Sequence, residues 1–294
     1  MQATLLHQLS SIRQITYFLK SSNIPFHSSS HPAIAVLIPH FNNPEGVKKT
    51  LHSLAYPGLI EIVVVDDGSD EAISKDFLGS ACSGNVRLHL IELPVNLGVE
   101  LALNKGLEFI KNNLDIKYIA RIDVGDVAVN DRLEKQVLFL ENNPPIGILG
   151  TAAKFVDFDG QEQFKIKYPL HNNKIKQHMG LRCSVLHPTV MFRGSIFSEV
   201  GFYPSKYPFA DDYAFFYQLM HKTKAANLPE ILTIVEHSSN SVSVENRTKQ
   251  LMSRIKVISK NFFSSPYSLL GITYTSIMLL FPYSLIVSLK SKLR

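Results

Sequence analysis

The stretch from Ile60 to Asp70, IEIVVVDDGSD, runs from an almost continuous apolar segment straight into a turn of acids and glycine. Such a run is typical of a strand covered on both faces, as in a parallel sheet. Three other segments are interpreted as strands of the same sheet: AIAVLIP at 33–39, VRLHLIEL at 86–93 and KYIARIDVGD at 117–126. We therefore expect four neighbouring strands in the first half of the chain.

Helical patterns separate these strands. NPEGVKKTLHSLAY at 43–56 begins with a capping asparagine and a proline suited to a first turn, and NLGVELALNKGLEFIKNN at 96–113 has an apolar stripe. NDRLEKQVLFLENNP at 130–144 starts with a D-x-x-E capping box from Asp131 to Glu134. Strands that alternate with helices predict βαβ units and a mostly parallel sheet with helices on both faces.

The second half has a mixed pattern. IGILGTAAKFVDFDG and EQFKIKYP predict an antiparallel pair that turns at Asp159–Gly160. Further along, the sequence predicts a short strand in HPTVMFR, helices in GSIFSEVG and DDYAFFYQLMHKT, and a last strand in NLPEILTIVEH. No repeat or evident linker separates the two halves, 33–126 and 127–260, so we expect one continuous α/β domain over 33–260.

Both ends of the chain differ from this domain. Residues 1–32 predict an amphipathic helix followed by a linker rich in serine and proline, and they lack the apolar core and cleavage site of a signal peptide. The helix is expected to pack on the domain, with a membrane-surface helix as the alternative.

The last segment, 261–294, is expected to be an apolar helical tail. Residues 268–289 carry no charge, and KSKLR follows. About 20 apolar residues span a bilayer, although Gly271 and Pro282 interrupt this run. Membrane association, as a span or a half-buried hairpin, is favoured over a soluble helix pair, and the basic end favours a cytoplasmic leaflet.

Composition limits the partners. The content of 45% hydrophobic and 19% charged residues is ordinary for a globular protein, and the net charge of +5 favours anionic partners such as nucleotides or phospholipid head groups. The basic residues form no long run, so no nucleic acid partner is expected. Cys82 and Cys183, without a CxxC pair, suit a reducing cytoplasm as small buried hydrophobes.

Three predicted strands end in polar residues: IPHFNN at 38–43, VDDGSD at 65–70 and RIDVGD at 121–126. In open α/β sheets, ligands bind beyond the carboxyl ends of the strands. The chain has no P-loop and no strand-linked G-x-G-x-x-G, so binding would depend on side-chain carboxylates, which suit a base edge and ribose hydroxyls. Taken alone, each acidic turn has a simple alternative as a solvated Asx turn.

In combination these pieces resemble a known family. AVLIPHFNNPEGVKKTLHSL, EIVVVDDGSDE, VNLGVELALNKGL and ARIDVGD occur in the order and spacing of the inverting nucleotide-sugar glycosyltransferases of family 2, which have the GT-A fold. DRLEKQVLFLENNPPIGILGT, HPTVMFRGSIFSEVGFY and FADDYAFFYQLM match further. The resemblance covers about residues 33–245. It makes 33–126 a nucleotide-binding half and 127–260 an acceptor half.

The resemblance implies transfer of a hexose from a nucleotide diphosphate sugar to a hydroxyl of a growing glycan or glycolipid. The setting it implies is bacterial surface polysaccharide or lipopolysaccharide synthesis, in the cytoplasm or at the cytoplasmic face of the inner membrane. The donor nucleotide would be held by residues that follow the predicted strands, namely Pro39, Phe41, Asn42, Asp66, Asp67, Asn96 and Asp123.

A Mg²⁺ or Mn²⁺ ion on the donor diphosphate is also implied, with Asp126 as main ligand and Asp123 and His237 as further candidates. The common Asp-Ala-Asp-Asp of the family is Asp123-Val124-Gly125-Asp126 here, so the third position offers no ligand. Magnesium needs only one or two carboxylates besides phosphate oxygens. The alternative is a lost metal site, with the donor bound by basic residues.

Inversion needs a base that takes the proton of the acceptor hydroxyl. Asp211 and Asp212 stand where the family shows its Glu-Asp pair, which implies Asp212 as the base and Asp211 as second choice. Their simpler interpretation is stabilisation of a helix dipole. His187 is expected to be structural, and Arg121, Arg132 and Arg247 are expected in solvated ion pairs rather than on phosphates.

Two rival functions stay open, and a third is disfavoured. A synthase that charges a polyprenyl phosphate with sugar shares the fold, and such an acceptor needs little general base. A non-catalytic carbohydrate- or partner-binding relative is favoured by Gly125. A nucleotidyltransferase is disfavoured, because PHFNNPEG at 39–46 is not a loop rich in glycine and basic residues.

Overall fold

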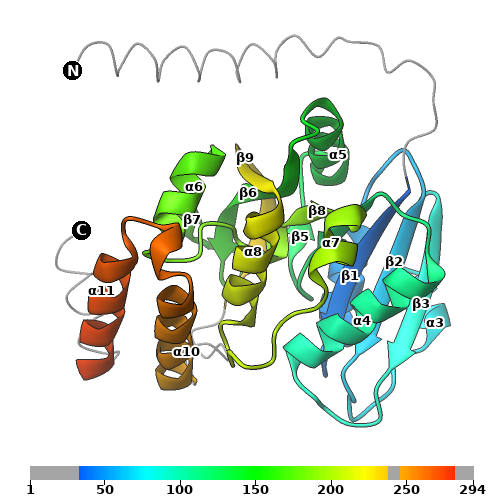
Figure 1. Cartoon of the computed structure of the whole chain (residues 1–294). Helices are drawn as coiled ribbons and strands as arrows, with labels where there is room; N and C mark the ends of the chain where they lie inside the picture. Colours follow the sequence, from blue (N-terminus) through cyan, green and yellow to red (C-terminus); the bar gives the residue numbers. More distant parts are fainter. Residues whose placement is uncertain (1–32, 238–245, 282–294) are drawn as a thin grey trace. The chain divides into compact units, whose positions relative to one another are not determined.

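The structure is a computed structural model, and it describes residues 33–237 and 246–281 (Figure 1). All the described residues belong to one compact unit. The helix and linker predicted over 1–32, and residues 282–294 of the predicted tail, lie outside the described residues.

The first four strands form the predicted parallel layer. They are β1 (Ile34–His40), β2 (Ile60–Asp66), β3 (Val86–Glu92) and β4 (Tyr118–Arg121), in the order β3-β2-β1-β4. Every residue of β2 is buried, as expected for a strand covered on both faces. The fourth strand is shorter than predicted, because the chain turns after Arg121, and residues 122–126 form a loop at the strand's carboxyl end.

The helices of this half are α2 (Pro44–His52), α3 (Lys75–Gly79), α4 (Val99–Asn113) and α5 (Arg132–Asn142). The apolar stripe of α4 packs into the core on one face of the sheet, and that of α2 packs into the core on the other. Asn43 caps α2 as predicted, because its Oδ1 accepts the N–H of Gly46 at 2.9 Å. The predicted capping box at Asp131 is wrong: Asp131 adopts a left-handed conformation (φ 56°), and its side chain makes no cap bond.

The sheet continues through the second half in the order β4-β8-β6-β9-β5, with β7 on β6. These strands are β5 (Val127–Ala128), β6 (Ile146–Val156), β7 (Glu162–Ile166), β8 (Met191–Arg193) and β9 (Lys224–Glu236). The antiparallel β6–β7 pair confirms the prediction. Only the end of HPTVMFR is a strand; its start is a 3-10 turn, η1 (His187–Thr189), because Pro188 has no N–H to donate to a ladder.

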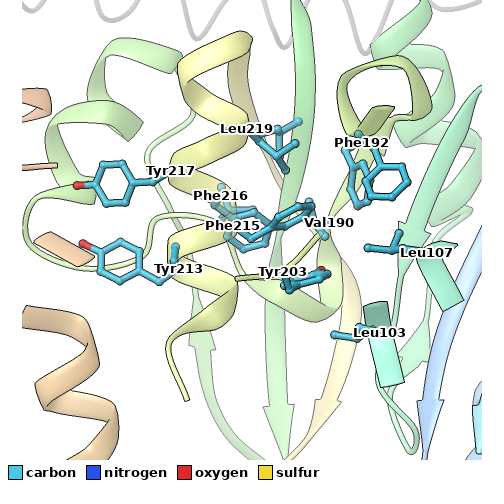
Figure 2. Close-up of a cluster of buried hydrophobic side chains, with 14 of the residues drawn as sticks. Leu103, Leu107, Val190, Phe192, Tyr203, Tyr213, Phe215, Phe216, Tyr217 and Leu219 are labelled. Carbon is cyan, nitrogen blue, oxygen red and sulfur yellow. The ribbon is translucent and has the colours of Figure 1, made fainter. Parts of the chain in front are cut away.

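The remaining helices are α6 (Asn172–Met179), α7 (Gly194–Val200), α8 (Asp211–Lys222), α10 (Arg247–Lys260), the short η2 (Phe262–Ser264) and α11 (Ser268–Leu280). Figure 2 shows Phe215 and Phe216 of α8 on the side of Leu103 and Leu107 of α4, whereas Tyr213 and Tyr217 point the other way. Tyr203 stacks on Phe215 with ring centroids 4.1 Å apart. This packing fixes the first turn of α8 over the sheet.

The described residues include no helix that is both long and apolar enough to cross a membrane. Within the predicted tail, residues 268–280 form the helix α11. The membrane-associated tail over 261–294 therefore stays a prediction.

Candidate active site

The loops after β1 and β2 are joined by a polar network. Asp66 is buried, and its Oδ1 accepts the N–H of Ser69 at 3.1 Å and the Ser69 hydroxyl at 2.6 Å. His40, the residue paired with Asp66 across the two strands, places Nδ1 at 3.3 Å from the same oxygen. Parallel register thus puts the two strand ends together, as their sequences predict.

Asn42 completes this network. Its backbone lies in the left-handed region (φ 50°), which asparagine tolerates. Its N–H donates to Ser69 Oγ at 2.8 Å, and its amide and Asp70 exchange two hydrogen bonds of 2.9 Å. Pro39 precedes this turn, and the neighbouring residue Phe41 is 45% exposed. An exposed ring beside a fixed polar turn is a surface on which a base could stack.

The carboxylate of Asp67 is hydrogen-bonded to the backbone of a neighbouring loop. Its two carboxylate oxygens accept the N–H groups of Leu97 and Gly98, each at 2.8 Å, and the residue is buried. These bonds hold the loop that also carries the exposed Asn96. Because each oxygen keeps a second acceptor site, contact of Asp67 with a ribose stays a prediction.

Arg121 lies at the centre of the site. It is 3% exposed, and both terminal nitrogens of its guanidinium contact the Asp123 carboxylate, with Nη1 at 2.6 Å from Oδ2. Its charge also lowers the pKa values of Asp211 and Asp212, against the stronger raising effect of burial. The predicted donor residue Asp123 therefore pairs with a buried cation, and the charge of that cation also acts on the predicted catalytic acids.

The prediction of solvated ion pairs for the arginines is wrong. Arg121 is the last residue of the buried strand β4, so its ion pair with Asp123 is buried on the arginine side. Arg132 is also buried, and it donates to Gln136 and to the carbonyl oxygen of Arg121. Arg247 donates to the carbonyl oxygen of Met278.

The loop of the predicted metal ligands is held from two sides. The Gly125 N–H donates to Thr50 Oγ1 at 3.0 Å, and that hydroxyl donates to the Asp126 carbonyl oxygen at 2.9 Å. From β9, the Glu236 N–H donates to Asp126 Oδ1 at 3.0 Å. Asp126 is 2% exposed, and its Oδ2 accepts no hydrogen bond from the part of the chain that the structure describes. Burial, with Asp123 nearby, raises the pKa of Asp126 well above its usual value.

The donor set fits a divalent cation in part. Over residues 33–237 and 246–281, no three acids, histidines or cysteines converge as a metal site. The ring of His237 packs edge-on against Phe155 and Phe164, with centroids 6.0 Å away in each case. The carboxylates of Asp123 and Asp126 remain, and the latter keeps a free oxygen. Two carboxylates match the ligand count that Mg²⁺ takes alongside phosphate oxygens.

Gly125 has a backbone conformation that other residues rarely adopt, with φ at +91°. A Cβ at this position would lie 3.2 Å from Glu236 Oε1. We expect Gly125→Ala to lower the free energy of unfolding by about 1–3 kcal/mol, because strain and crowding add. Urea unfolding followed by circular dichroism measures this loss. Gly84→Ala is the control, because Gly84 shares the positive φ (+81°) but has open space around its Cβ direction. A loss at Gly125 no larger than that at Gly84 would exclude a role for Glu236.

Asp211 and Asp212 begin α8, as predicted. Burial and the charge of Asp211 raise the pKa of Asp212 to about 7. The Asp212 Oδ1 accepts the N–H of Tyr213 at 2.7 Å, so the carboxylate is oriented. An oriented carboxylate with a pKa near neutrality suits a general base. Both acids also lie in the first turn of the helix, where the dipole favours them.

Sequence reasoning missed Glu100. This residue stands in the first turn of α4, its Oε1 is buried without a partner among the described residues, and its pKa is raised by burial and by Asp211. A third acid, on another helix, therefore lies close enough to Asp211 for its pKa to be affected. His187, by contrast, is structural as predicted: its Nε2 lies 2.8 Å from the Tyr203 hydroxyl, and burial lowers its pKa.

A mixed sheet with acids at its strand ends matches the GT-A type of glycosyltransferase, and comparisons with known proteins identify the family. Residues 35–201 match the family described as glycosyl transferase family 2. The chain is 31% identical over 230 residues to the amylovoran biosynthesis glycosyltransferase AmsE of Erwinia amylovora, covering 76% of this chain and 83% of that protein. The chain belongs to glycosyl transferase family 2.

Solved structures show the same fold at low identity. S. aureus TarS 1–349 in complex with UDP-GlcNAc has a TM-score of 0.58 at 16% identity, covering 77% of this chain and 66% of that one. The mannosyltransferase PcManGT from Pyrobaculum calidifontis, in complex with GDP-Man and Mn²⁺, has a TM-score of 0.57 at 15% identity, covering 94% and 80%. This chain thus spans just under two thirds of the TarS fragment.

Proposed function

We propose that this glycosyltransferase moves a hexose, with inversion, from a nucleotide diphosphate sugar to a hydroxyl of a growing glycan or glycolipid. The observation that carries the proposal is the buried Arg121, which pairs with Asp123 and whose charge also acts on Asp211 and Asp212. AmsE, which is named for amylovoran biosynthesis, supports a surface polysaccharide as the product.

The donor would lie across the loops after β1 and β2. The Asn42–Asp70 bonds and the Asp66–Ser69 bonds give these loops one fixed arrangement, beside the exposed ring of Phe41. Asp67 would act on the donor mainly by holding the loop of Asn96. The nucleotide complexes of TarS and PcManGT support a donor of this class.

A divalent cation would be held by Asp126 and Asp123. When bound, it would offset the charge that develops on the leaving nucleoside diphosphate. Asp126 would offer its free Oδ2. Asp123 would offer a carboxylate that is 40% exposed and already oriented by Arg121. The Mn²⁺ in the PcManGT structure supports use of such an ion.

Asp212 would take the proton of the acceptor hydroxyl. Its pKa of about 7, raised by desolvation and by the charge of Asp211, lets it accept a proton near neutral pH. A lipid-linked acceptor would place the enzyme at the cytoplasmic face of the inner membrane. The apolar run at 268–289 and the basic KSKLR support that location.

The donor and the metal can be tested together by calorimetric titration of UDP, GDP and dTDP, each with and without Mn²⁺. We expect one nucleotide to bind best and Mn²⁺ to tighten its binding roughly tenfold or more, because the ion would offset the negative charges of the diphosphate and of Asp123 and Asp126. Asp126→Asn should remove the gain from Mn²⁺ and leave the metal-free affinity nearly unchanged.

Asp115→Asn is the matched control, because Asp115 is exposed in the loop before β4, at the far end of that strand. It should behave as the wild type. If no nucleotide shows binding linked to Mn²⁺, the metal-dependent mechanism is wrong. If no nucleotide binds at all, the proposed transfer reaction is wrong as well.

A further inference from the structure

The helix α11 packs with its small and polar residues inward. Ser268, Gly271 and Thr275 recur at three- to four-residue spacing, and all three are buried. Gly271 lies so close to the loop after α6 that a Cβ on it would be 1.8 Å from the Gly180 carbonyl oxygen. The Thr275 hydroxyl donates to the carbonyl oxygen of Gly271 at 2.6 Å. The inward face of this helix is therefore built for close backbone contact.

Its outward face is apolar. The exposed large side chains of α11 and the residue after it are Leu269, Leu270, Tyr274, Ile277, Leu280 and Phe281. Phe263, in the turn before α11, is 99% exposed. A surface helix of a globular protein normally shows the opposite distribution, with its apolar stripe facing the core. A continuous exposed apolar face of this kind marks an interaction site.

The neighbouring helix α10 supplies positive charge. Figure 1 shows α10 and α11 as adjacent helices, in orange and red, and Arg247 of α10 donates to the Met278 carbonyl oxygen. Lys249, Lys256 and Lys260 are exposed at spacings that place them on one side of α10. No aspartate or glutamate occurs from 247 to 281. The helix pair thus combines an apolar face with uncompensated basic residues.

We propose that α10 and α11 dock this enzyme on the surface of an anionic phospholipid bilayer. The apolar side chains of α11 enter the boundary between head groups and acyl chains, and the α10 lysines face lipid phosphates. The sequence beyond the described residues continues this character, because 282–289 is uncharged and Lys290, Lys292 and Arg294 follow. A bilayer uses both the apolar and the basic features, whereas a second copy of the chain would bring like charges together.

This inference deepens the proposed function, because it names the surface that would carry a lipid-linked acceptor. Lipid binding itself does not require transfer activity. The test therefore uses the full chain without substrate, mixed with vesicles of phosphatidylethanolamine and phosphatidylglycerol or of phosphatidylcholine alone, and floated on a density gradient. We expect the chain to float with the anionic vesicles and much less with the neutral ones.

The double variant Leu270→Glu/Ile277→Glu should lower the partition coefficient by about a hundredfold, at roughly tenfold for each buried side chain lost. Lys249→Glu/Lys256→Glu should remove the preference for anionic vesicles. Phe158→Glu is the matched control, because Phe158 is 73% exposed in the turn between β6 and β7, and it should float as the wild type does.

Three outcomes would overturn the docking proposal. The Leu270/Ile277 variant could float like the wild type, or the wild type could stay at the bottom of the gradient. In the second case, light scattering that shows a dimer would identify a second copy as the occupant, and a chain that floats only after truncation at Phe281 would identify residues 282–294. The third outcome is that Phe158→Glu lowers flotation with anionic vesicles as much as the Leu270/Ile277 variant does. If all variants still bind nucleotide, a failure of the docking proposal does not count against the proposed transfer reaction.

Discussion

Asp212→Asn is expected to lower the rate of sugar transfer by about 10²- to 10⁴-fold, the usual contribution of a general base. The amide has nearly the same shape, so its oxygen can still accept the Tyr213 N–H and the helix start is kept. Nucleotide affinity should therefore change little. Transfer rates and calorimetric affinities measured on the same preparation check both statements.

The same residue sets the expected pH dependence. A base must be ionised to act, and the pKa of Asp212 is raised to about 7 by burial and by Asp211. The wild-type rate should therefore fall as pH decreases through about 7, and the residual rate of Asp212→Asn should not show that step. If Asp212→Asn keeps full activity, Asp211 is the next candidate. If the Asp211/Asp212 double variant also stays active, the acceptor is a phosphate that needs little base.

As pH rises through this range, the free energy of unfolding should change in the opposite direction to the transfer rate. The pKa of the folded carboxyl lies above its ordinary value of 3.8, so ionisation of Asp212 opposes folding. This penalty is absent at low pH, grows as pH rises between about 4 and 7, and is then constant. Asp212→Asn should accordingly raise the Tm above pH 7, and the gain should shrink on acidification. A Tm gain independent of pH would contradict this electrostatic origin.

Arg121→Met is expected to cause the largest loss of stability, about 3–5 kcal/mol in the free energy of unfolding, because it leaves acids without their buried cation. Asp123 loses a bidentate partner, and Asp211 and Asp212 lose a nearby positive charge. Denaturant unfolding measures the loss. The penalty should decrease at low pH, where the acids are protonated.

Arg87→Met is the control for this change. Arg87 pairs with Glu61, but its side chain is 69% exposed, so its removal should cost within about 1 kcal/mol. Combining Arg121→Met with Asp123→Asn should restore part of the lost stability, because the double variant removes both charges of the pair. If the two arginine variants lose similar amounts, Arg121 is not the electrostatic centre of the site.

Much of the site follows from local sequence. Asp66 ends a buried parallel strand, and parallel register alone places it beside His40. Asp211 and Asp212 stand at the start of an aromatic helix, and that pattern is also local. The fold could also be predicted from local sequence, because strands that alternate with amphipathic helices allow few topologies.

The remaining features depend on distant packing. Arg121 ends a short strand, and its burial beside Tyr203 depends on packing that no local pattern reveals. Glu100 resembles an ordinary first-turn acid until α8 brings Asp211 towards it. His237 follows Glu236, whose N–H bonds the loop of Asp126, but successive residues of a strand point to opposite faces. The ring of His237 therefore packs on Phe155 and Phe164.

The loop from Asp123 to Asp126 is fixed by α2 on one side and by β9 on the other, through Thr50 and Glu236. Its conformational entropy is therefore lost during folding rather than when a donor arrives. Preorganisation of this kind lets contacts made with the diphosphate appear almost fully as affinity. It also links the two halves of the chain mechanically, because the residues that would hold the donor are fixed in part by β9, from the second half.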